Sequence, residues 1–470
     1  MVPETVKHFI GGQYVHSTLR KSYGVTDPAT GKEYAQVEVG LGADINQAVL
    51  AARAALATGP WPGMAAPDRA RVLSGIADEI DARADDIAAS EALSTGLPVT
   101  QSREQTAPAA DLFRLAADLI TATVASGDLV ARPAGVAGLI TPWCTPFLAQ
   151  ARAVAPALAA GCPVVLKPDE WAPLPAALLA EITTAAGLPD GVLNIVHGSL
   201  HRKAPGTQAR DALIAHPSVP RLSFAGDAVT GQQVALDVVT HRKILSAEPN
   251  GNAPCVIFAD ADLDQATDSA VFGAFALNGQ RRTATSAIFA QRPVYDALVS
   301  RLAGRADRIR VGAPSDPATE IGALPHTDHY DAVVSRVRLG IREGARLAAG
   351  GRRPADLPEG NYLAATVLAD VTPDMQVFTE QICGPVVRVT PFDTEEEAVS
   401  LAGAAPTAYL WTADLERAHR LAPAFGAASL WVNSGNPRDR QPGDVSIDFY
   451  TQSQTVHIAA DDAPVPRFGA

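Results

Sequence analysis

Hydrophobic positions near the start of the chain follow a helical period after a short extended region. Apolar residues recur every three to four positions over 45–56 and again over 70–91, and Asp44 stands where it can cap the first stretch. This spacing predicts two amphipathic helices joined by the loop GPWPGMAAP. Ahead of them, HFIGGQYV and the turn DPATG at 27–31 predict short extended segments around a tight turn.

From Gly135 the pattern changes to continuous apolar runs separated by helical stretches. The runs are VAGLIT, CPVVLKP and VLNIVHG, and a second series begins near Ala253 with PCVIFADADLD and ends near SLWVN at 429–433. Strands that are apolar along their whole length and alternate with helices are typical of a buried parallel sheet. The pattern therefore predicts an α/β protein with two α/β regions, and YTQSQTVHI predicts a terminal strand.

Composition narrows the class of protein. The chain has 470 residues, enough for about three domain-sized units, and its 47% hydrophobic and 19% charged residues are typical of a folded protein. Lys and Arg number 38 against 51 Asp and Glu, and this net charge of -13 disfavours nucleic acid or an anionic membrane surface as a partner.

Cysteine spacing and the N-terminal segment indicate the compartment. The four cysteines form no CxxC motif and no Cys/His cluster with zinc spacing, so we expect a reducing environment and no metal. The N-terminus lacks a basic start followed by a long apolar run, and we find no later run of 18 uncharged apolar residues. We therefore expect a cytoplasmic protein.

The ten histidines form no HxxxH or HExxH pair, and we expect His197 to be a loop residue.

Candidate chemistry lies where the predicted strands end, because ligands of doubly wound sheets bind at the carboxyl ends of strands. The residues that follow three of the strands are TPWC, KPDE and AGDAVTG. In the last of these, Gly226 and Gly231 enclose four residues. Such a spacing is usually ordinary loop geometry and less often a phosphate-binding turn.

Taken together and in this order, these turns resemble the NAD(P)-dependent aldehyde dehydrogenase superfamily. Further similar segments run nearly end to end: DPATG at 27–31, TPW at 141–143, VLKPDE at 165–170, GLPDGVLN at 187–194, FADADLD at 258–264, GQ at 279–280, ICGPV at 382–386 and LWVN at 430–433. The resemblance implies an α/β, aldehyde dehydrogenase-like fold with a Rossmann-type cofactor domain, an α/β catalytic domain and a small β hairpin that joins subunits.

The resemblance also implies domain boundaries. The cofactor domain would comprise 1–111 and 132–246, and the catalytic domain 247–439. The oligomerisation hairpin and terminal strand would comprise 112–131 and 440–470. The resemblance thus implies a homo-oligomer, and we expect a dimer. The segment before Gly135 is shorter than the hairpin of the family.

The catalytic positions depart from the family pattern. The family nucleophile is a cysteine two positions after Gly-Gln, and here that position holds Arg282, whose guanidinium cannot act as a nucleophile. The asparagine that donates to the oxyanion after Thr-Pro-Trp is replaced by Cys144, a weaker donor. The carboxylate that activates water matches Glu248.

The cofactor positions include both matches to the family pattern and departures from it. Lys167 and Glu170 match the pair that holds the adenine ribose, and Glu170 favours NAD over NADP. Asp227 replaces a serine that faces the pyrophosphate, and its charge opposes a phosphate there. Gln381 replaces the glutamate at the nicotinamide ribose, and Cys383 replaces an aromatic residue near the ring.

The resemblance further implies that Trp143, Gly226 and Gly231 lie at the cofactor. We therefore expect NAD to bind weakly, with its nicotinamide end poorly positioned.

Three interpretations follow. In the first, the protein does not perform cysteine-dependent aldehyde oxidation, and its pocket is repurposed: Arg282 binds a small anionic ligand and Glu248 transfers protons. In the second, it is a non-catalytic homologue in which Glu248 only pairs with Arg282. The alternative is an NAD-dependent aldehyde dehydrogenase that uses Cys144 as a relocated nucleophile.

Overall fold

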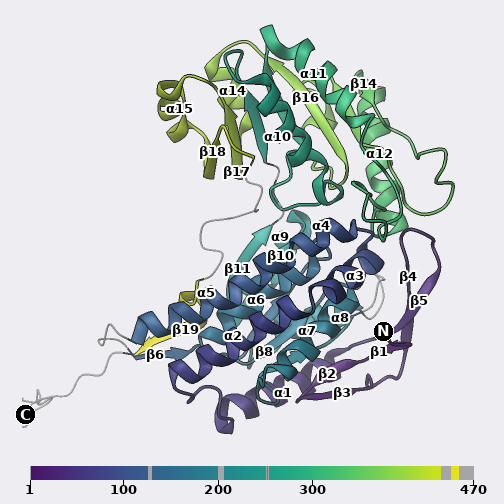
Figure 1. Cartoon of the computed structure of the whole chain (residues 1–470). Coiled ribbons are helices and arrows are strands. Elements are labelled where there is room, and N and C mark those ends of the chain that lie inside the picture. Colours follow the sequence, from purple (N-terminus) through teal and green to yellow (C-terminus); the bar gives the residue numbers. More distant parts are fainter. Residues whose placement is uncertain are drawn as a thin grey trace, which may run out of the picture.

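Two seven-stranded sheets, each in its own lobe, organise the chain (Figure 1). The computed structural model describes residues 2–124, 130–198, 206–249, 251, 253–435 and 446–454. Both sheets are mainly parallel, as the apolar strand pattern predicted, and the predicted α/β fold is confirmed.

The first sheet contains five parallel strands and an antiparallel pair at one edge. Its order is β11 (Ile244–Pro249), β10 (Arg221–Gly226), β7 (Ala137–Ile140), β8 (Val164–Lys167), β9 (Leu193–Ile195), β2 (His8–Ile10) and β3 (Gln13–Val15). The helices of this lobe are α1 (Gly42–Thr58), α2 (Ala66–Ala82), α3 (Ala84–Thr95), α4 (Val99–Glu104), α5 (Thr106–Val124), α6 (Pro146–Ala159), α7 (Pro173–Ala185), α8 (Gly206–Ala215) and α9 (Ala228–Thr240).

The second sheet is parallel except for one antiparallel strand at its edge. Its order is β14 (Arg346–Ala349), β15 (Thr366–Ala369), β16 (Val386–Phe392), β13 (Ala287–Gln291), β12 (Pro254–Ile257), β17 (Ala404–Trp411) and β18 (Gly426–Val432). Its helices are α10 (Leu263–Phe275), α11 (Arg292–Ala306), α12 (Thr327–Glu343), α13 (Gln376–Thr379), α14 (Glu395–Ala402) and α15 (Leu415–Leu421).

Two small sheets complete the fold. One consists of β1 (Thr5–Val6), β5 (Glu33–Glu38) and β4 (Ser22–Thr26), and the other pairs β6 (Val130–Pro133) with β19 (Thr451–Gln454). The β6–β19 pair extends from the side of the first lobe (Figure 1). The expected terminal strand is thus present over 451–454. The domain boundaries stay a prediction, and 440–445 and 455–470 lie outside the described residues.

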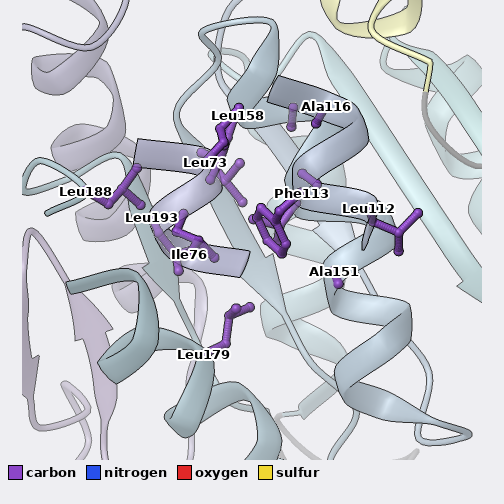
Figure 2. Packing of buried hydrophobic residues seen from close by; sticks show 14 of the residues in the cluster. Leu73, Ile76, Leu112, Phe113, Ala116, Ala151, Leu158, Leu179, Leu188 and Leu193 are labelled. Atoms are coloured by element: carbon purple, nitrogen blue, oxygen red, sulfur yellow. The ribbon is translucent and has the colours of Figure 1, made fainter. Parts of the chain in front are cut away.

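The core of the first lobe explains why its helices form where the period predicts them. Leu73 and Ile76 of α2 pack near Phe113 of α5, and Leu158 of α6 joins the same cluster (Figure 2). Phe113 is fully buried, and burying such a side chain contributes about 1.5–3 kcal/mol. The helices that position the candidate site are therefore held by a large apolar core.

Two local predictions need correction. The helical stretch over 70–91 is divided at Arg83, whose backbone (φ -109°, ψ 22°) leaves the helical region between α2 and α3. Asp44 is not the N-cap of α1 but its third residue, and its carboxylate accepts a hydrogen bond from the Leu41 amide at 2.8 Å. The hydrophobic periodicity correctly predicted which face of each helix is buried. It could not predict where each helix ends, because helix ends depend on individual hydrogen bonds.

Candidate active site

The carboxyl ends of β7, β8 and β10 bring three of the predicted turns to one edge of the first sheet, since these strands are parallel neighbours. Trp143 and Cys144 lie on the turn between β7 and α6, Lys167 ends β8, and Asp227 follows β10. The rule that chemistry follows the strand ends therefore places these residues on one side of the lobe.

Lys167 and Glu170 form an ion pair of 2.8 Å between Nζ and Oε1, with side-chain exposures of 6% and 21%. Gly198 lies against this pair: a Cβ at Gly198 would approach Lys167 Cε at 2.9 Å. A side chain at 198 would therefore require the end of the Lys167 side chain to shift. A lysine and a carboxylate beside open backbone fit the hydroxyl groups of a ribose, as the resemblance implied.

Gly226 and Gly231 owe their identity to packing. A Cβ on Gly226 would lie 2.7 Å from Phe224 Cζ, and one on Gly231 would lie 3.1 Å from Phe224 Cε1. Asp227 is the N-cap of α9, and its carboxylate accepts from the Thr230 amide at 2.9 Å. A carboxylate thus already satisfies one amide of the helix N-terminus at which a phosphate would bind.

Four rings bridge the two lobes next to this edge. The Trp143 ring lies 5.8 Å from Trp171 and 4.8 Å from His329 at the start of α12, while Trp171 stacks on His326 at 4.9 Å. His329 Nε2 donates to the Cys383 carbonyl at 2.6 Å, because a carbonyl only accepts. Burial lowers the pKa of His329 to about 4, so its ring is neutral at pH 7.

Cys383 lies close to the first lobe. Burial raises the pKa of its thiol, and neighbouring charge on Cys144 and Asp227 raises it further. Gln381 lies two residues earlier, and its Nε2 donates to the Gly251 carbonyl at 3.2 Å. The structure therefore brings Cys383 towards Cys144 and Asp227, while Gln381 is held by the backbone that follows β11.

Arg282 and Glu248 form an ion pair, as one interpretation of the sequence expected. The Arg282 side chain is 11% exposed and that of Glu248 is 48% exposed. Removal of one partner from a fully buried pair would cost about 3–5 kcal/mol. Because Glu248 is half exposed, solvent screens this pair, and loss of one partner should cost about 1 kcal/mol or less.

The loop that presents Arg282 is held by left-handed backbone. Leu277 (φ 54°), Asn278 (φ 58°) and Gly279 (φ 67°) follow one another, and a Cβ on Gly279 would collide with the Gly384 carbonyl. Asn278 Nδ2 donates to the carbonyls of Gly96 and Ala323 at 3.2 and 2.9 Å. These bonds tie the loop to both lobes.

An open cavity of about 560 Å³, a volume that includes space open to solvent, lies beside Arg282 and Glu248. The described residues that line it are Ala149, Arg152, Ala153, Pro156, Ser223, Ala225, Ser246, Glu248, Arg282, Ser446, Phe449 and Tyr450. No cysteine is among these described lining residues. Cys144 is only 2% exposed, although it lies on the turn just before α6.

Sequence reasoning missed two residues of this region. Arg152 enters the cavity from α6, and the signal was available, because Ala149, Arg152, Ala153 and Pro156 have the spacing of one helix face. Glu91 of α3 is 1% exposed and accepts from the Phe147 amide at the start of α6 at 2.9 Å. No local pattern marks Glu91, because its partner is 56 positions away.

His197 is a loop residue, as expected. It follows β9 but is 2% exposed, and its ring stacks 6.1 Å from that of His8. Burial lowers the pKa of His197 to about 3, with a smaller contribution from the neighbouring His8, so the ring is neutral at physiological pH. The loop position by itself did not indicate that His197 is buried beside His8 of the N-terminal strand β2.

Across the described parts of the chain, no three His, Cys, Asp or Glu side chains come together as a metal site would require. No helix in the part of the chain that the structure describes is both long and apolar enough to cross a membrane.

Known proteins are similar to this chain over nearly its whole length. A family model described as "Aldehyde dehydrogenase family" matches residues 14–444. The 5-carboxymethyl-2-hydroxymuconate semialdehyde dehydrogenase of Escherichia coli is 39% identical over 92% of this chain and 94% of its own length. The 2-hydroxymuconic semialdehyde dehydrogenase of Pseudomonas sp. (strain CF600) is 36% identical over 96% of this chain and 99% of its own.

Solved structures agree over nearly the whole chain. HpcC from Thermus thermophilus has a TM-score of 0.92 at 37% identity, covering 99% of this chain and 95% of its own. An NAD+ complex of an aldehyde dehydrogenase from Bacillus cereus has a TM-score of 0.90 at 32% identity, covering 96% of both chains.

Proposed function

Because the chain belongs to the aldehyde dehydrogenase family, we propose that it is an NAD-dependent oxidoreductase acting on a small aldehyde. The support is the pair of relatives named as semialdehyde dehydrogenases, each matched over more than nine-tenths of both chains. The observation in the structure that carries the proposal is the Lys167–Glu170 pair at the carboxyl end of β8, because it is the part of a cofactor site that is kept intact.

The residues present fit the adenosine end of NAD better than its pyrophosphate. Lys167 and Glu170 would hold the adenine ribose beside Gly198, and Trp143 lies on the adjacent turn. When bound, the nicotinamide supplies a hydride acceptor. Asp227 would oppose the pyrophosphate, so we keep the expectation of weak affinity as part of the proposal.

Aldehyde oxidation also needs a nucleophile, and in this proposal it is Cys144. Its thiolate would add to the carbonyl carbon, and Glu248 would accept the proton of the water that releases the acid product. The support is the position of Cys144 on the turn that leads into α6, one face of which lines the cavity. Because Cys144 is 2% exposed, this chemistry requires the turn to move.

A second candidate function rests on the Arg282–Glu248 ion pair. A guanidinium at the nucleophile position cannot form a thiohemiacetal, and its pairing with Glu248 suits an anion-binding pocket with a nearby proton-transfer group. In this candidate, cysteine-dependent oxidation is lost and a small anionic molecule is bound or converted without redox chemistry.

The decisive experiment measures NADH formation from aliphatic and aromatic aldehydes with the purified chain. The dehydrogenase proposal expects turnover that Cys144→Ala abolishes and that Cys255→Ala, a buried thiol of the second lobe, leaves unchanged. Absence of turnover in the unchanged chain, with turnover gained in Arg282→Cys, would refute the dehydrogenase proposal and support the loss of oxidation that the second candidate requires. Turnover that survives Cys144→Ala would refute the role of Cys144.

We further propose that the chain forms a homo-oligomer. The supporting feature is an apolar surface on α9, where Val229, Leu236 and Val239 are exposed beside the edge strand β11. Sedimentation of the purified chain would test it, and a monomer at micromolar concentration would refute it. A cytoplasmic location likewise stays a prediction.

A further inference from the structure

The cavity beside Glu248 is lined from three parts of the described chain. Ser223 and Ser246 lie in register on the paired strands β10 and β11, and one face of α6 contributes Ala153. The C-terminal segment contributes Ser446, Phe449 and Tyr450. Among these described lining residues, Tyr450 brings the one phenol group.

The backbone at Tyr450 is held firmly against the first lobe. Its carbonyl accepts hydrogen bonds from the Ala134 amide at 2.9 Å and from Cys162 Sγ at 3.1 Å. The preceding carbonyl, that of Phe449, accepts from Arg221 Nε at 2.9 Å, and the two aromatic rings meet edge to face at 4.8 Å. These contacts fix the position from which the Tyr450 ring reaches the cavity.

The phenol group of Tyr450 is a proton donor that is only weakly used. The residue is 4% exposed, and its hydroxyl lies 3.5 Å from the Ala153 carbonyl, which is long for a bond between two oxygens. Burial raises the pKa of this phenol and the charge of Glu248 raises it further, while Ser223 acts in the opposite direction. The phenol therefore keeps its proton at pH 7 and lies close to Ser223 and Glu248.

We propose that Tyr450 is a carbonyl-binding residue, whose hydroxyl donates a hydrogen bond to the carbonyl oxygen of a small aldehyde in the cavity. An acceptor at about 2.7 Å would replace the long contact with Ala153. The resemblance gives the role of oxyanion donor to an asparagine that Cys144 replaces, and a fixed phenol can perform the same role. Glu248, in the same lining, would then accept a proton from water beside the bound carbonyl.

This inference rests on the proposed function for the aldehyde, but the carbonyl site itself does not depend on oxidation. Its test therefore measures equilibrium binding without NAD. Calorimetry would compare benzamide, an unreactive carbonyl compound, with toluene, which has a similar ring but no acceptor. Tyr450→Phe keeps the ring and removes the hydroxyl, so it should weaken benzamide about 3- to 10-fold and leave toluene unchanged.

Infrared spectroscopy of benzamide with an isotopically labelled carbonyl detects the hydrogen bond directly. In the unchanged protein, the carbonyl band of the bound probe should lie at lower wavenumber than in an aprotic solvent, and Tyr450→Phe should move it back. Tyr34→Phe is the matched control, because it removes a tyrosine hydroxyl that bonds Ser94 at 3.2 Å and lies outside the described lining. Ser223→Ala tests the other hydroxyl beside the phenol.

A weaker affinity for benzamide and a reversed band shift in Tyr450→Phe, with neither change in Tyr34→Phe, support the inference. A band in the unchanged protein at its aprotic position overturns it, and this measurement needs no variant to fold. The inference is also overturned if Ser223→Ala alone removes the shift, or if benzamide does not bind at millimolar concentration. Absence of NADH formation alongside benzamide binding that depends on Tyr450 would refute the dehydrogenase proposal and leave the carbonyl site standing.

Discussion

Glu91 offers a sharp test of how the turn before α6 is held, because its carboxyl group is buried between α3 and α6. One of its oxygens accepts a hydrogen bond from the Phe147 amide at 2.9 Å, and the residue is 1% exposed. Burial raises the pKa of Glu91 from 4.5 to about 7, although the hydrogen bond from the Phe147 amide acts in the opposite direction. Glu91→Gln keeps the shape and the acceptor but removes the titration.

The size and sign of the effect follow from linkage. Because the pKa is raised in the folded state, stability from protonated Glu91 is fully present below pH 4.5 and is lost as the pH rises through about 7. The difference between the two pKa values corresponds to about 3 kcal/mol, at about 1.4 kcal/mol for each pH unit. Relative to the unchanged protein, Glu91→Gln should therefore gain about 2–3 kcal/mol between pH 5 and pH 8.

Urea denaturation of both proteins at several pH values measures this gain. The matched control is Glu104→Gln, which alters an exposed carboxylate on the neighbouring α4 and should show no pH-dependent difference. A constant difference between Glu91→Gln and the unchanged protein from pH 5 to pH 8 would refute the argument, since it would mean that Glu91 titrates alike in the folded and unfolded chains.

Two further predictions concern the cofactor edge and the loop before Arg282. Asp227→Ser keeps an N-cap on α9 but removes its charge, so NAD affinity in calorimetry should rise about tenfold. Asp262→Ser, the same change at the N-cap of α10, should not alter it. Gly279→Ala should lower the free energy of unfolding by about 2 kcal/mol or more, because a left-handed glycine meets backbone there. Gly31→Ala, also left-handed (φ 70°) but with open space around it, should cost about 1 kcal/mol; equal losses would contradict the packing argument.

Much of the cofactor edge could be predicted from the sequence. The apolar runs predicted parallel strands, and the residues just after them, such as Lys167 and Glu170, could be assigned to one edge of a sheet. At single positions, Arg282 could be recognised as a departure from a family pattern and Glu248 as a match to it. These inferences succeed because strand period and strand direction are local properties of the chain.

Tertiary structure decided which residues line the cavity. Arg152 lines the same cavity as Ser223 and Ser246 although the sequence separations are 71 and 94 positions, and such separations carry no local signal. Likewise, Glu91 reaches the Phe147 amide only when α3 packs near α6. The sequence by itself determined which residues lie at strand ends and on helix faces. The packing of those elements decided which charges are buried, which are screened and which share one pocket, because burial and distance are properties of the assembled fold.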